Sequence, residues 1–474
     1  MNKKIYITTS IPYVNAPPHI GHALEFVQAD CLARFYRATG YDVYFSSGAD
    51  ENSLKNVQSA EAEGIPVQEL VDKYAKTFSD LRDSLNLTFD VFNRTSAKDH
   101  FRGAQKLWSL CRSEDIYKKK YRGLYCVGCE QFYSTDELVD GKCPEHLTVP
   151  EKVEEENYFF KLSNYQKYLE DLVESDELKI VPPTRRNEVL SFIKSGLSDF
   201  SISRSRERAR GWGVPVPGND SQVMYVWFDA LTTYLTALGF GSGNEKLFEK
   251  YWKDDSNRLH VIGKGIIRFH AVYWIAMLKS AGIDLPTAEF VHGYVTVNGQ
   301  KISKSLRNIV DPFDLVHDFG VEAVRFYLLR EIPAWGDGDF SQTRFKDLYN
   351  GELANGLGNL VARVARLATD IKLNLPDKKN YTFKKAVADS LKNFRFDQAI
   401  FAIWEEISKL DKLINEQKPW ELSGGDLKRV ISPIAVQIRE IAFNLSPFMP
   451  GTSATILAQF TGNVTQAKPL FPRI

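Results

Sequence analysis

Residues 4–22 read KIYITTSIPYVNAPPHIGH and place a strand, a loop and the start of a helix in direct succession. Residues 4–10 are rich in β-branched and apolar side chains, which is typical of a buried strand. A helical pattern then begins near Pro18 and runs to Thr39, where Gly40 supplies the stop signal. Apolar residues at spacings of three and four line one face of this predicted helix: Leu24, Val27, Cys31 and Phe35.

Two histidines, His19 and His22, stand one turn apart at the predicted start of this helix. The first N–H groups of a helix have no partner within it and its dipole is positive there, so we expect an anion site. Imidazole N–H groups can donate to phosphate oxygens, and Gly21 lets a flat ligand approach the backbone. The alternative is a helix start that carries two histidines without a ligand.

A second strand over residues 41–50 completes a strand–helix–strand unit and ends at Asp50. In an open α/β sheet, ligands bind outside the carboxyl ends of the strands, so Asp50 is a candidate ligand-binding residue. Helical patterns follow over residues 55–86 and 97–116.

The composition is that of an ordinary globular protein. The chain has 474 residues, 43% of them hydrophobic and 25% charged, which is enough for about two to four domains. The 60 basic and 60 acidic residues balance, so the total charge gives no argument for a nucleic-acid partner. No apolar run approaches the roughly 20 residues that span a bilayer. A polar N-terminus and an odd number of cysteines (five) predict a cytoplasmic protein without membrane contact.

Residues 117–150 interrupt this pattern with two pairs of metal-binding residue types. Cys126-Val-Gly-Cys129 is followed by Cys143-Pro-Glu-His146, so three of the five cysteines fall together. Three thiolates and one imidazole at this spacing match a tetrahedral Zn²⁺ site, which is structural because four protein ligands leave no position for a substrate. Reduced structural thiols and a redox pair are the alternatives.

The next part of the chain returns to alternating strands and helices. Residues 222–238 read as a strand that runs into a helix, and residues 259–263 as another short strand. The helix that follows carries a stripe of aromatic and apolar groups: Ile266, His270 and Trp274. Such a stripe is more often core than pocket. An arginine run starts at Arg204, and it is either a solvated face or an anchor for a carboxylate or phosphate.

A strand over residues 289–297 leads into the turn Asn298-Gly299 and then into Lys301-Ile-Ser-Lys304-Ser. Two lysines and two serines in an exposed loop suit a mobile phosphate clamp, although such loops are common. A helix is expected over residues 311–330. From about residue 346 helical patterns dominate, which predicts a helix bundle. That part has 18 Lys+Arg and 13 Asp+Glu, a net of +5, as expected if it contacts a polyanion.

Taken in order and at these separations, the motifs resemble those of class I aminoacyl-tRNA synthetases. The resemblance narrows to methionyl-tRNA synthetases through SIPYVNAPPHIGH, VMYVWFDAL, FVHGYVTVNGQKISKS and INEQKPW, and it covers essentially the whole chain. It implies an α/β fold class, with a Rossmann-type parallel-sheet catalytic domain, a zinc-knuckle insert and an all-α anticodon-binding domain. The implied boundaries are 1–116 and 184–345 for the catalytic halves, 117–183 for the insert and 346–474 for the helical domain. The matching form has no added C-terminal tRNA-binding domain and is usually a monomer.

The resemblance implies a methionine–tRNA ligase. The carboxylate of L-methionine attacks the α-phosphate of ATP, methionyl-adenylate and pyrophosphate form, and the 3′ end of tRNA(Met) takes the acyl group. By this resemblance His19 and His22 bind the triphosphate, with Gly21 under the adenine. Lys304, with Lys301 beside it, holds the phosphates in the transition state. Mg²⁺ is expected to accompany ATP.

The resemblance also carries a methionine pocket onto this chain, in which Asp50 receives the α-ammonium and Arg204 faces the carboxylate. The implied pocket residues are Ile11, Tyr13, Asp50, Arg204, Trp227, Ala230, Tyr234, Ile266, His270 and Trp274. Aromatic and apolar walls suit a polarizable thioether. Because they discriminate by only about 10–200-fold per methylene, we expect measurable activation of norleucine or homocysteine.

The anticodon-reading residues carry over onto Asn359, Arg363 and Trp420. The first two lie four apart, on one face of a predicted helix. Trp420 is expected to stack on an unpaired base; its alternative is a core aromatic that follows a proline bend.

The sequence departs from the family pattern at three places. Ile302 stands where the family usually has methionine, and Asn52-Ser53 stands where it usually has His-Gly. Gly265 replaces the usual aspartate after Gly-Lys, which leaves a catalytically impaired, tRNA-binding paralogue as an alternative. A sibling synthetase for valine, isoleucine or leucine needs a long editing insertion, and no insert here is long enough.

Overall fold

The structure is a computed structural model that describes residues 3–128, 131–133, 135–145, 147–253, 255–302, 308–369, 371–373, 375 and 381–474. The chain forms two compact units. The first unit comprises Met1–Pro18, Gly40–Arg82 and Thr88–Val291. The second unit comprises His19–Thr39, Asp83–Leu87 and His292–Ile474.

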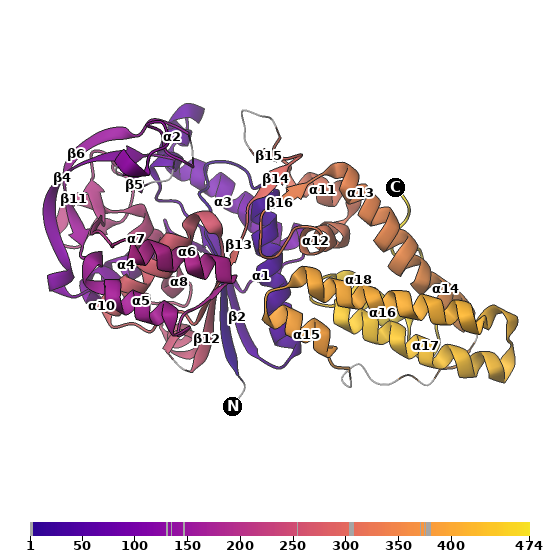
Figure 1. The fold of residues 1–474 in the computed structure, drawn as a ribbon. Helices are drawn as coiled ribbons and strands as arrows, with labels where there is room; N and C mark the ends of the chain where they lie inside the picture. Colours follow the sequence, from indigo (N-terminus) through magenta and orange to yellow (C-terminus); the bar gives the residue numbers. More distant parts are fainter. Residues whose placement is uncertain are drawn as a thin grey trace. The chain divides into compact units, whose positions relative to one another are not determined.

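A six-stranded sheet forms the centre of the first unit, in the spatial order β3-β2-β1-β12-β13-β7 (Figure 1). Its strands are β1 (Lys4–Thr9), β2 (Asp42–Ala49), β3 (Val91–Arg94), β7 (Lys179–Val181), β12 (Ser256–Gly263) and β13 (Ala288–His292). The pairings β3–β2, β2–β1, β1–β12 and β13–β7 are all parallel. Strand order reverses between β1 and β12, which is where open α/β sheets bind ligands. The predicted α/β fold class is confirmed.

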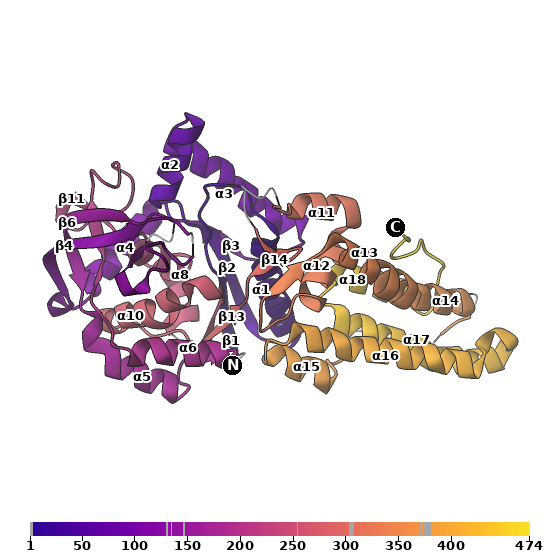
Figure 2. The same ribbon diagram turned by 45° about the horizontal axis from the view of Figure 1, so that its top comes forward.

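The insert adds an antiparallel sheet in the order β5-β4-β6-β8. Its strands are β4 (Ile116–Cys126), β5 (Gln131–Tyr133), β6 (Glu151–Phe160) and β8 (Phe200–Ser201). Figure 2 shows β4 and β6 running together, and they pair from Ile116↔Phe160 to Tyr125↔Glu151. A small sheet follows, formed by β9 (Ser203–Ser205), β10 (Pro215–Val216) and β11 (Asn219–Met224).

Helices complete the first unit. They are α2 (Leu54–Glu63), α3 (Val67–Ser84), α4 (Lys98–Leu110), α5 (Gln166–Glu174), α6 (Pro183–Lys194), α7 (Val226–Leu231), α8 (Thr233–Thr236), α9 (Lys246–Phe248) and α10 (Ile275–Ala281). The pattern over residues 55–86 is divided into α2 and α3 by Gly64, whose φ of 69° ends α2. One hydrophobic core unites the sheet, α4, the insert and α8, and it includes Tyr6, Leu107, Phe160 and Leu235.

The second unit contains α1 (Ile20–Ala38), which matches the predicted helix and ends before Gly40 at φ 85°. The four residues predicted on one face are buried. So are Glu25, Gln28 and Asp30, and the helix is therefore buried nearly all round rather than along one stripe.

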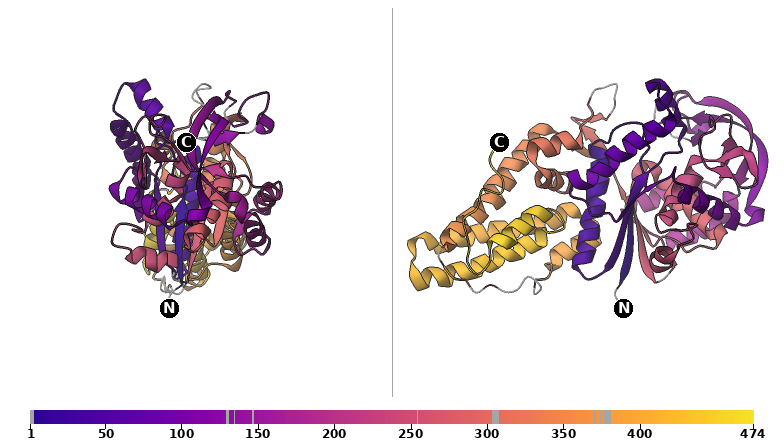
Figure 3. Two further views of the ribbon diagram at one scale, coloured as in Figure 1. Left: turned by 90° about the vertical axis from the view of Figure 1, so that its left-hand side faces the viewer. Right: turned by 180° about the vertical axis from the view of Figure 1, so that it is seen from behind.

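The remainder of the second unit is mainly helical, as predicted from residue 346 onward. Its helices are α11 (Pro312–Phe319), α12 (Val321–Arg330), α13 (Gln342–Leu348), α14 (Asn359–Ala368), α15 (Lys385–Lys392), α16 (Phe396–Gln417), α17 (Gly424–Leu445) and α18 (Pro450–Gln459). Helices α14, α16 and α17 run side by side (Figure 3). A small sheet joins β14 (Val295–Val297), β15 (Gln300–Lys301) and β16 (Gly338–Phe340). Within the described ranges, none of the helices has both the length and the apolarity that a bilayer crossing requires.

Two predicted elements are each broken in two. The strand expected over residues 289–297 is β13 and β14, separated at Gly293, where a Cβ would lie 2.1 Å from the carbonyl oxygen of Gly336. The helix expected over residues 311–330 is α11 and α12, because Gly320 has φ 82° and ψ 150° and interrupts the helix. Both breaks depend on glycine, which tolerates close backbone approach and positive φ.

Candidate active site

His19 and His22 form a reciprocal cap at the start of α1. The Nδ1 atom of His19 accepts the backbone N–H of Gly21 at 3.1 Å, and Nδ1 of His22 accepts the backbone N–H of His19 at 3.1 Å. The two rings stack with centroids 3.9 Å apart and planes inclined by 29°. Because both Nδ1 atoms accept hydrogen bonds, the proton of each neutral ring is on Nε2.

The backbone donors of this helix start are already used, which corrects the expectation that they would receive an anion directly. The N–H of Ile20 donates to the carbonyl of Val310 at 3.0 Å, and that of Gly21 donates to His19. Any further donor to an anion here must therefore come from the imidazole rings, whose protons are on Nε2. Gly21 is needed by the cap itself, since a Cβ at this position would lie 2.9 Å from the ring of His19.

Burial keeps both histidines neutral. It lowers the pKa of His19 to about 4. The pKa of His22 is lowered well below its usual value, first by burial and then by the neighbouring His19 and His292. A neutral imidazole has one N–H, so each ring presents a single donor of fixed direction.

A buried pair in the second unit, Glu25 and His292, was not predicted from the sequence. Glu25, one turn further along α1, lies with Oε2 2.8 Å from Nε2 of His292. Both side chains are 8% exposed. A glutamate within a buried helical stretch could have signalled a buried partner, because carboxylates are rarely buried unless paired.

The Lys–Ser motif follows a tight hairpin, as predicted. Asn298 and Gly299 have φ of 50° and 75° between β14 and β15, which is the geometry of a two-residue hairpin turn. Lys301 is exposed at the end of β15, and its carbonyl accepts from Nδ2 of Asn308 at 3.0 Å. Lys304 lies outside the described residues.

In the first unit, the segments after β1 and β2 meet. Tyr13 and Asp50 form a parallel bridge, and the N–H of Asp50 donates to the carbonyl of Pro12 at 2.9 Å. A Cβ at Gly48, in β2, would lie 3.0 Å from a methyl group of Ile11. Asp50 is 3% exposed, so its carboxylate lies buried at the carboxyl edge of the sheet beside two other predicted pocket residues.

Several of the predicted pocket residues are aromatic, and they pack in the hydrophobic core of the first unit. The hydroxyl of Tyr234 and Nε2 of His270 are 2.7 Å apart, and Nδ1 of His270 lies 2.9 Å from the carbonyl oxygen of Ile266. The rings of Tyr234 and Trp274 are 6.1 Å apart at 63°. The backbone is π-helical over Phe269–Trp274, a form that is frequent at functional sites. Three predicted pocket residues, Ile266, His270 and Tyr234, are therefore in direct contact. His270 also has the hydrogen bonds expected of a core histidine.

Trp227 joins these residues from α7, which also holds Ala230. Its ring stacks on Phe269 at 3.8 Å and 4° and stands edge-on to His270 at 6.4 Å. The indole nitrogens of Trp227 and Trp274 are buried without a hydrogen-bond partner among the described residues.

Arg204 sits in β9 with its guanidinium among aromatic rings. It is 7% exposed, and Nη2 donates to the hydroxyl of Tyr125 at 2.9 Å. The guanidinium lies 5.4 Å from the ring centroid of Tyr125 and 5.5 Å from that of Tyr225. Arg204 and Asn52 line the same narrow gap, which is too small for a water molecule. The arginine run therefore includes a buried cation as well as exposed members.

A buried polar network joins the Asp50 loop to α7, and it was not predicted from the sequence. Nδ2 of Asn52 donates to Oδ2 of Asp229 at 2.7 Å, and Oδ1 of Asp229 lies 2.6 Å from Nε2 of His100. The N–H of Asn52 donates to Oδ1 of Asp50 at 3.3 Å. Asn52, one of the departures from the family pattern, thus has a defined structural role. The acidic Asp229 within an apolar helix was the available signal.

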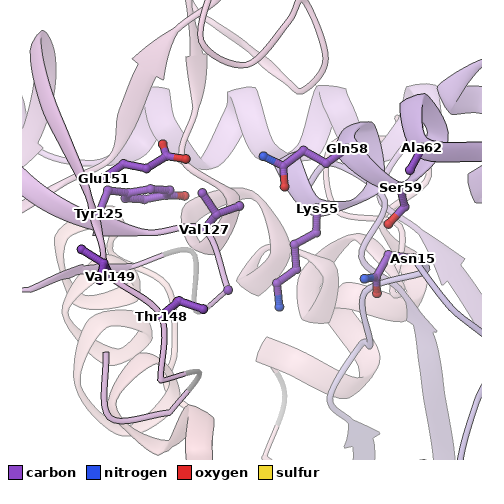
Figure 4. A pocket seen from close by; sticks show the side chains of 11 residues that line it. Asn15, Lys55, Gln58, Ser59, Ala62, Tyr125, Val127, Thr148, Val149 and Glu151 are labelled. Atoms are coloured by element: carbon purple, nitrogen blue, oxygen red, sulfur yellow. The ribbon is translucent and has the colours of Figure 1, made fainter. Parts of the chain in front are cut away.

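A cavity of about 470 Å³ opens in the first unit between α2 and the end of β4 (Figure 4). Lys55 extends into it, and its Nζ lies 4.8 Å from the ring centroid of Tyr13. The wall residues on the α2 side include Gln58 and Ser59, and those on the insert side include Tyr125 and Glu151.

The two described cysteines of the predicted zinc knuckle lie in one small cluster. Cys126 and Cys143 are 1% and 0% exposed and pack with Tyr133. The N–H of Cys143 donates to the carbonyl of Thr148 at 2.9 Å. Within the described part of the chain no group of three or more His, Cys, Asp or Glu side chains is arranged to hold a metal ion. Cys129 and His146 lie outside that part.

The predicted anticodon residues meet on the second unit. The guanidinium of Arg363 lies 5.1 Å from the ring of Trp420, and its Nη1 donates to Oδ1 of Asp411 at 3.0 Å. Trp420 is 50% exposed, so it is not a core aromatic. Asn359 is exposed at the start of α14, one turn before Arg363.

Gly265 lies exposed in a short 3₁₀ segment, Lys264–Ile266, just after β12. Its neighbour Ile266 is half-buried and accepts the His270 contact through its carbonyl. The aspartate that the family usually carries is therefore absent from an exposed position next to Ile266, a predicted pocket residue.

Comparison with known proteins identifies the family. The model of the family described as tRNA synthetases class I (M) matches residues 5–149 and 146–365. A methionine–tRNA ligase of Caldanaerobacter subterraneus is 39% identical, over 97% of this chain and 74% of that protein. One of Brucella suis is 40% identical, over 96% of this chain and 91% of that protein.

A solved structure is similar along its whole length. Mycobacterium tuberculosis methionyl-tRNA synthetase in complex with methionyl-adenylate has a TM-score of 0.91 and 38% identity, covering 99% of this chain and 100% of that chain. The resemblance predicted from the motifs is confirmed, and the methionine–tRNA ligase reading is supported over the impaired paralogue. The chain belongs to the methionyl-tRNA synthetase family of class I tRNA synthetases.

Proposed function

We propose that the chain is an active methionine–tRNA ligase that joins L-methionine to tRNA(Met) in two steps. In the first, a carboxylate oxygen of methionine attacks the α-phosphate of ATP, the bond to the β-phosphate breaks, and methionyl-adenylate and pyrophosphate form. In the second, a hydroxyl of the terminal adenosine of tRNA attacks the acyl carbon and AMP leaves. The protein mainly positions the reactants and stabilises charge on phosphate.

Residues of the first unit bind the amino acid in this proposal. Asp50 receives the α-ammonium, and Arg204 faces the carboxylate, so opposite charges meet the two ends of the zwitterion. The ring wall that includes Tyr234, His270 and Trp274 surrounds the thioether. Ile11, Tyr13, Trp227, Ala230 and Ile266 complete the proposed pocket.

Residues of the second unit bind the triphosphate. The Nε2–H groups of His19 and His22 donate to phosphate oxygens, and since both rings are neutral and fixed by their caps, no reorganisation is needed as charge develops. Lys301 and Lys304 add positive charge from the loop that follows β14. ATP enters as its Mg²⁺ complex, in which the ion neutralises phosphate charge as part of the substrate.

We also propose one structural Zn²⁺ at Cys126, Cys129, Cys143 and His146. The two described cysteines of this set support it, because Cys126 and Cys143 are buried in one small cluster with Tyr133. Three thiolates and an imidazole are a donor set that zinc prefers, and the bound ion would stabilise the fold of the knuckle.

The helical part of the second unit reads tRNA in this proposal. Arg363 and Trp420 present a cation against an exposed indole, which is a suitable surface for an unpaired anticodon base. We propose that these roles are divided among three predicted domains. They are the catalytic domain at 1–116 and 184–345, the insert at 117–183 and the helical domain at 346–474. We propose that the protein acts in the cytoplasm as a monomer.

The proposal of a methionine pocket is supported chiefly by the contacts of His270 with the Tyr234 hydroxyl and the Ile266 carbonyl, which bring three predicted pocket residues together. Purified protein with zinc should exchange labelled pyrophosphate into ATP when methionine is added, and not when leucine, isoleucine or valine is added. Charging should be efficient for a tRNA with a C-A-U anticodon and poor when that anticodon is changed. Absence of methionine-dependent exchange would favour the impaired paralogue in which Gly265 has removed activity.

A further inference from the structure

We propose that Asp229 is a positioning residue that fixes the loop carrying Asp50 relative to the helices that carry the proposed methionine pocket. This inference rests on the proposed function, in which Asp50 receives the α-ammonium of methionine. Asp229 lies in α7, in sequence between the predicted pocket residues Trp227 and Ala230. It is 1% exposed and hydrogen-bonded to residues outside that helix. We therefore assign it a role that it exerts through its neighbours.

On one side, Asp229 holds the loop that follows β2. Its Oδ2 accepts a hydrogen bond from Nδ2 of Asn52 at 2.7 Å, and the same amide also donates to the carbonyl of Thr95 at 3.0 Å. Because a carboxylate and a carbonyl can only accept, the amide nitrogen of Asn52 must face both. The backbone N–H of Asn52 donates in turn to Oδ1 of Asp50 at 3.3 Å. The fixed side chain of Asn52 therefore fixes a backbone donor to Asp50.

On the other side, Asp229 contacts His100 of α4. Oδ1 of Asp229 lies 2.6 Å from Nε2 of His100, and Nδ1 of that ring lies 2.8 Å from the hydroxyl oxygen of Thr236 in α8. The predicted pocket residue Tyr234 belongs to the same short helix as Thr236. His100 therefore joins α7 to α8, and Asp229 connects both helices to the Asp50 loop.

The hydrogen-bonded link from Asn52 through Asp229 to His100 sets a separation that matters for an amino acid. In the proposed pocket, methionine is held at two points, with its ammonium at the Asp50 loop and its thioether on α7 and α8. Asn52, Asp229 and His100 are 9%, 1% and 1% exposed, so water competes little for their hydrogen bonds. The link keeps the two points at one separation before the substrate arrives, so binding does not have to supply that order.

The first test separates geometry from charge. In Asp229→Asn the amide oxygen can accept from Asn52, and the amide N–H can donate to Nε2 of His100 when the ring proton is on Nδ1. The contacts are kept, so the KM for methionine in pyrophosphate exchange should stay within about three-fold of the parent value. Asp229→Ala removes them, and its methionine KM should rise on the order of ten-fold, with the KM for ATP within about two-fold. Equal methionine KM values for the two variants would overturn the proposal.

The second test asks which end of the ligand depends on Asp229. L-Methioninol keeps the ammonium and the thioether, so its inhibition constant should rise on the order of ten-fold in Asp229→Ala. The analogue of methionine with hydrogen in place of its amino group does not use the Asp50 loop, so its inhibition constant should change less than about two-fold. Both constants are independent of the fraction of folded protein, which keeps the test valid if the variant is less stable. An equal loss for both ligands would mean a general disturbance of the pocket, against the proposal.

A third variant breaks the link from the loop side, without a change inside a helix. Asn52→Ala should raise the methionine KM on the order of ten-fold, as Asp229→Ala does. The double variant should show less than about a two-fold further rise, because the two residues act as one unit. A parent-like KM for Asn52→Ala, or a larger further rise in the double variant, would show that the two residues act separately and would contradict the link.

Asp115→Ala is the matched control. Asp115 is a buried acid of the same unit, 2% exposed, and its carboxylate contacts Arg112, Tyr165 and Ser280. Its loss should lower stability and leave both KM values within about two-fold of the parent. A methionine KM raised as much as in Asp229→Ala would mean that any buried acid of this core has the effect, against a specific role.

The failures of the two proposals are distinguishable. Lack of methionine-dependent exchange by the parent protein would defeat the proposed function. An active parent with unaffected Asp229→Ala and Asn52→Ala variants would defeat only this inference.

Discussion

The Nδ1 atom of His22 accepts a hydrogen bond from the backbone N–H of His19. His19 in turn caps α1, because its own Nδ1 accepts a hydrogen bond from the backbone N–H of Gly21. The cap and the proposed phosphate contact therefore use opposite nitrogens of each ring. This separation allows the capping role of a histidine to be kept while its donor is removed.

His19→Asn should show that separation. Asparagine caps helices well, so thermal unfolding should shift by only a few degrees, at most about 1 kcal/mol. The Nε2–H donor is lost, and the rate of pyrophosphate exchange should fall about 100-fold or more, with the KM for methionine unchanged. Full activity of this variant would show that His19 acts only as a cap.

Stability should fall in acid through the same residue. Burial lowers the pKa of His19 to about 4, whereas an unfolded histidine has a pKa of about 6.5. Between these values the unfolded chain binds a proton that the folded chain does not, so this contribution is complete above pH 6.5 and is lost toward pH 4. The melting temperature of His19→Asn, measured over that range, should depend less steeply on pH than that of the parent. Parallel curves would contradict the assignment.

Zinc should depend on the knuckle cysteines and on no others. The parent protein is expected to carry about one Zn²⁺ per chain by elemental analysis, and Cys143→Ser to carry almost none. Cys111→Ser is the matched control, because Cys111 is also buried but lies in the main core of the first unit. It should retain its zinc; metal content that is equal in all three proteins would refute the site.

Trp420→Ala should impair charging but not activation. One stacked base contributes about 1–3 kcal/mol, so kcat/KM for tRNA should fall about 5- to 150-fold while pyrophosphate exchange is unchanged. Trp420→Phe should recover part of the loss. Phe401→Ala is the control, since Phe401 is a similarly exposed aromatic residue of α16, at 56% against 50% for Trp420. An equal effect of both alanine variants would argue against a specific role for Trp420.

A buried ion pair should stabilise the second unit more than an exposed one. Nη2 of Arg325, in α12, lies 2.8 Å from Oδ2 of Asp30 in α1, and both side chains are 0% exposed. Arg325→Met removes one partner and should cost about 3–5 kcal/mol in the free energy of unfolding. Arg344→Met, which breaks the more exposed pair with Glu331, should cost less than about 1 kcal/mol. Chemical denaturation of the two variants checks the difference.

Much of the fold follows from short-range patterns. The limits of β1, β2 and α1, and the Asn298-Gly299 hairpin, were predictable because strand alternation, helix spacing and positive φ depend on neighbouring residues. The stripe of Ile266, His270 and Trp274 was visible too, but its contact with Tyr234, which approaches from another helix, was not.

The sequence alone established the order of the motifs, the α/β class and the two histidines at a helix start, since each is written in adjacent residues. Tertiary structure decided what those residues contact. It supplied hydrogen-bond partners for the first N–H groups of α1 and divided residues 289–297 at Gly293. It also joined Arg204 to Tyr125, 79 positions away in sequence, by a hydrogen bond. The reason is physical: hydrogen bonds and close backbone approaches join groups that are near in space, and no spacing along the chain encodes which distant groups will meet.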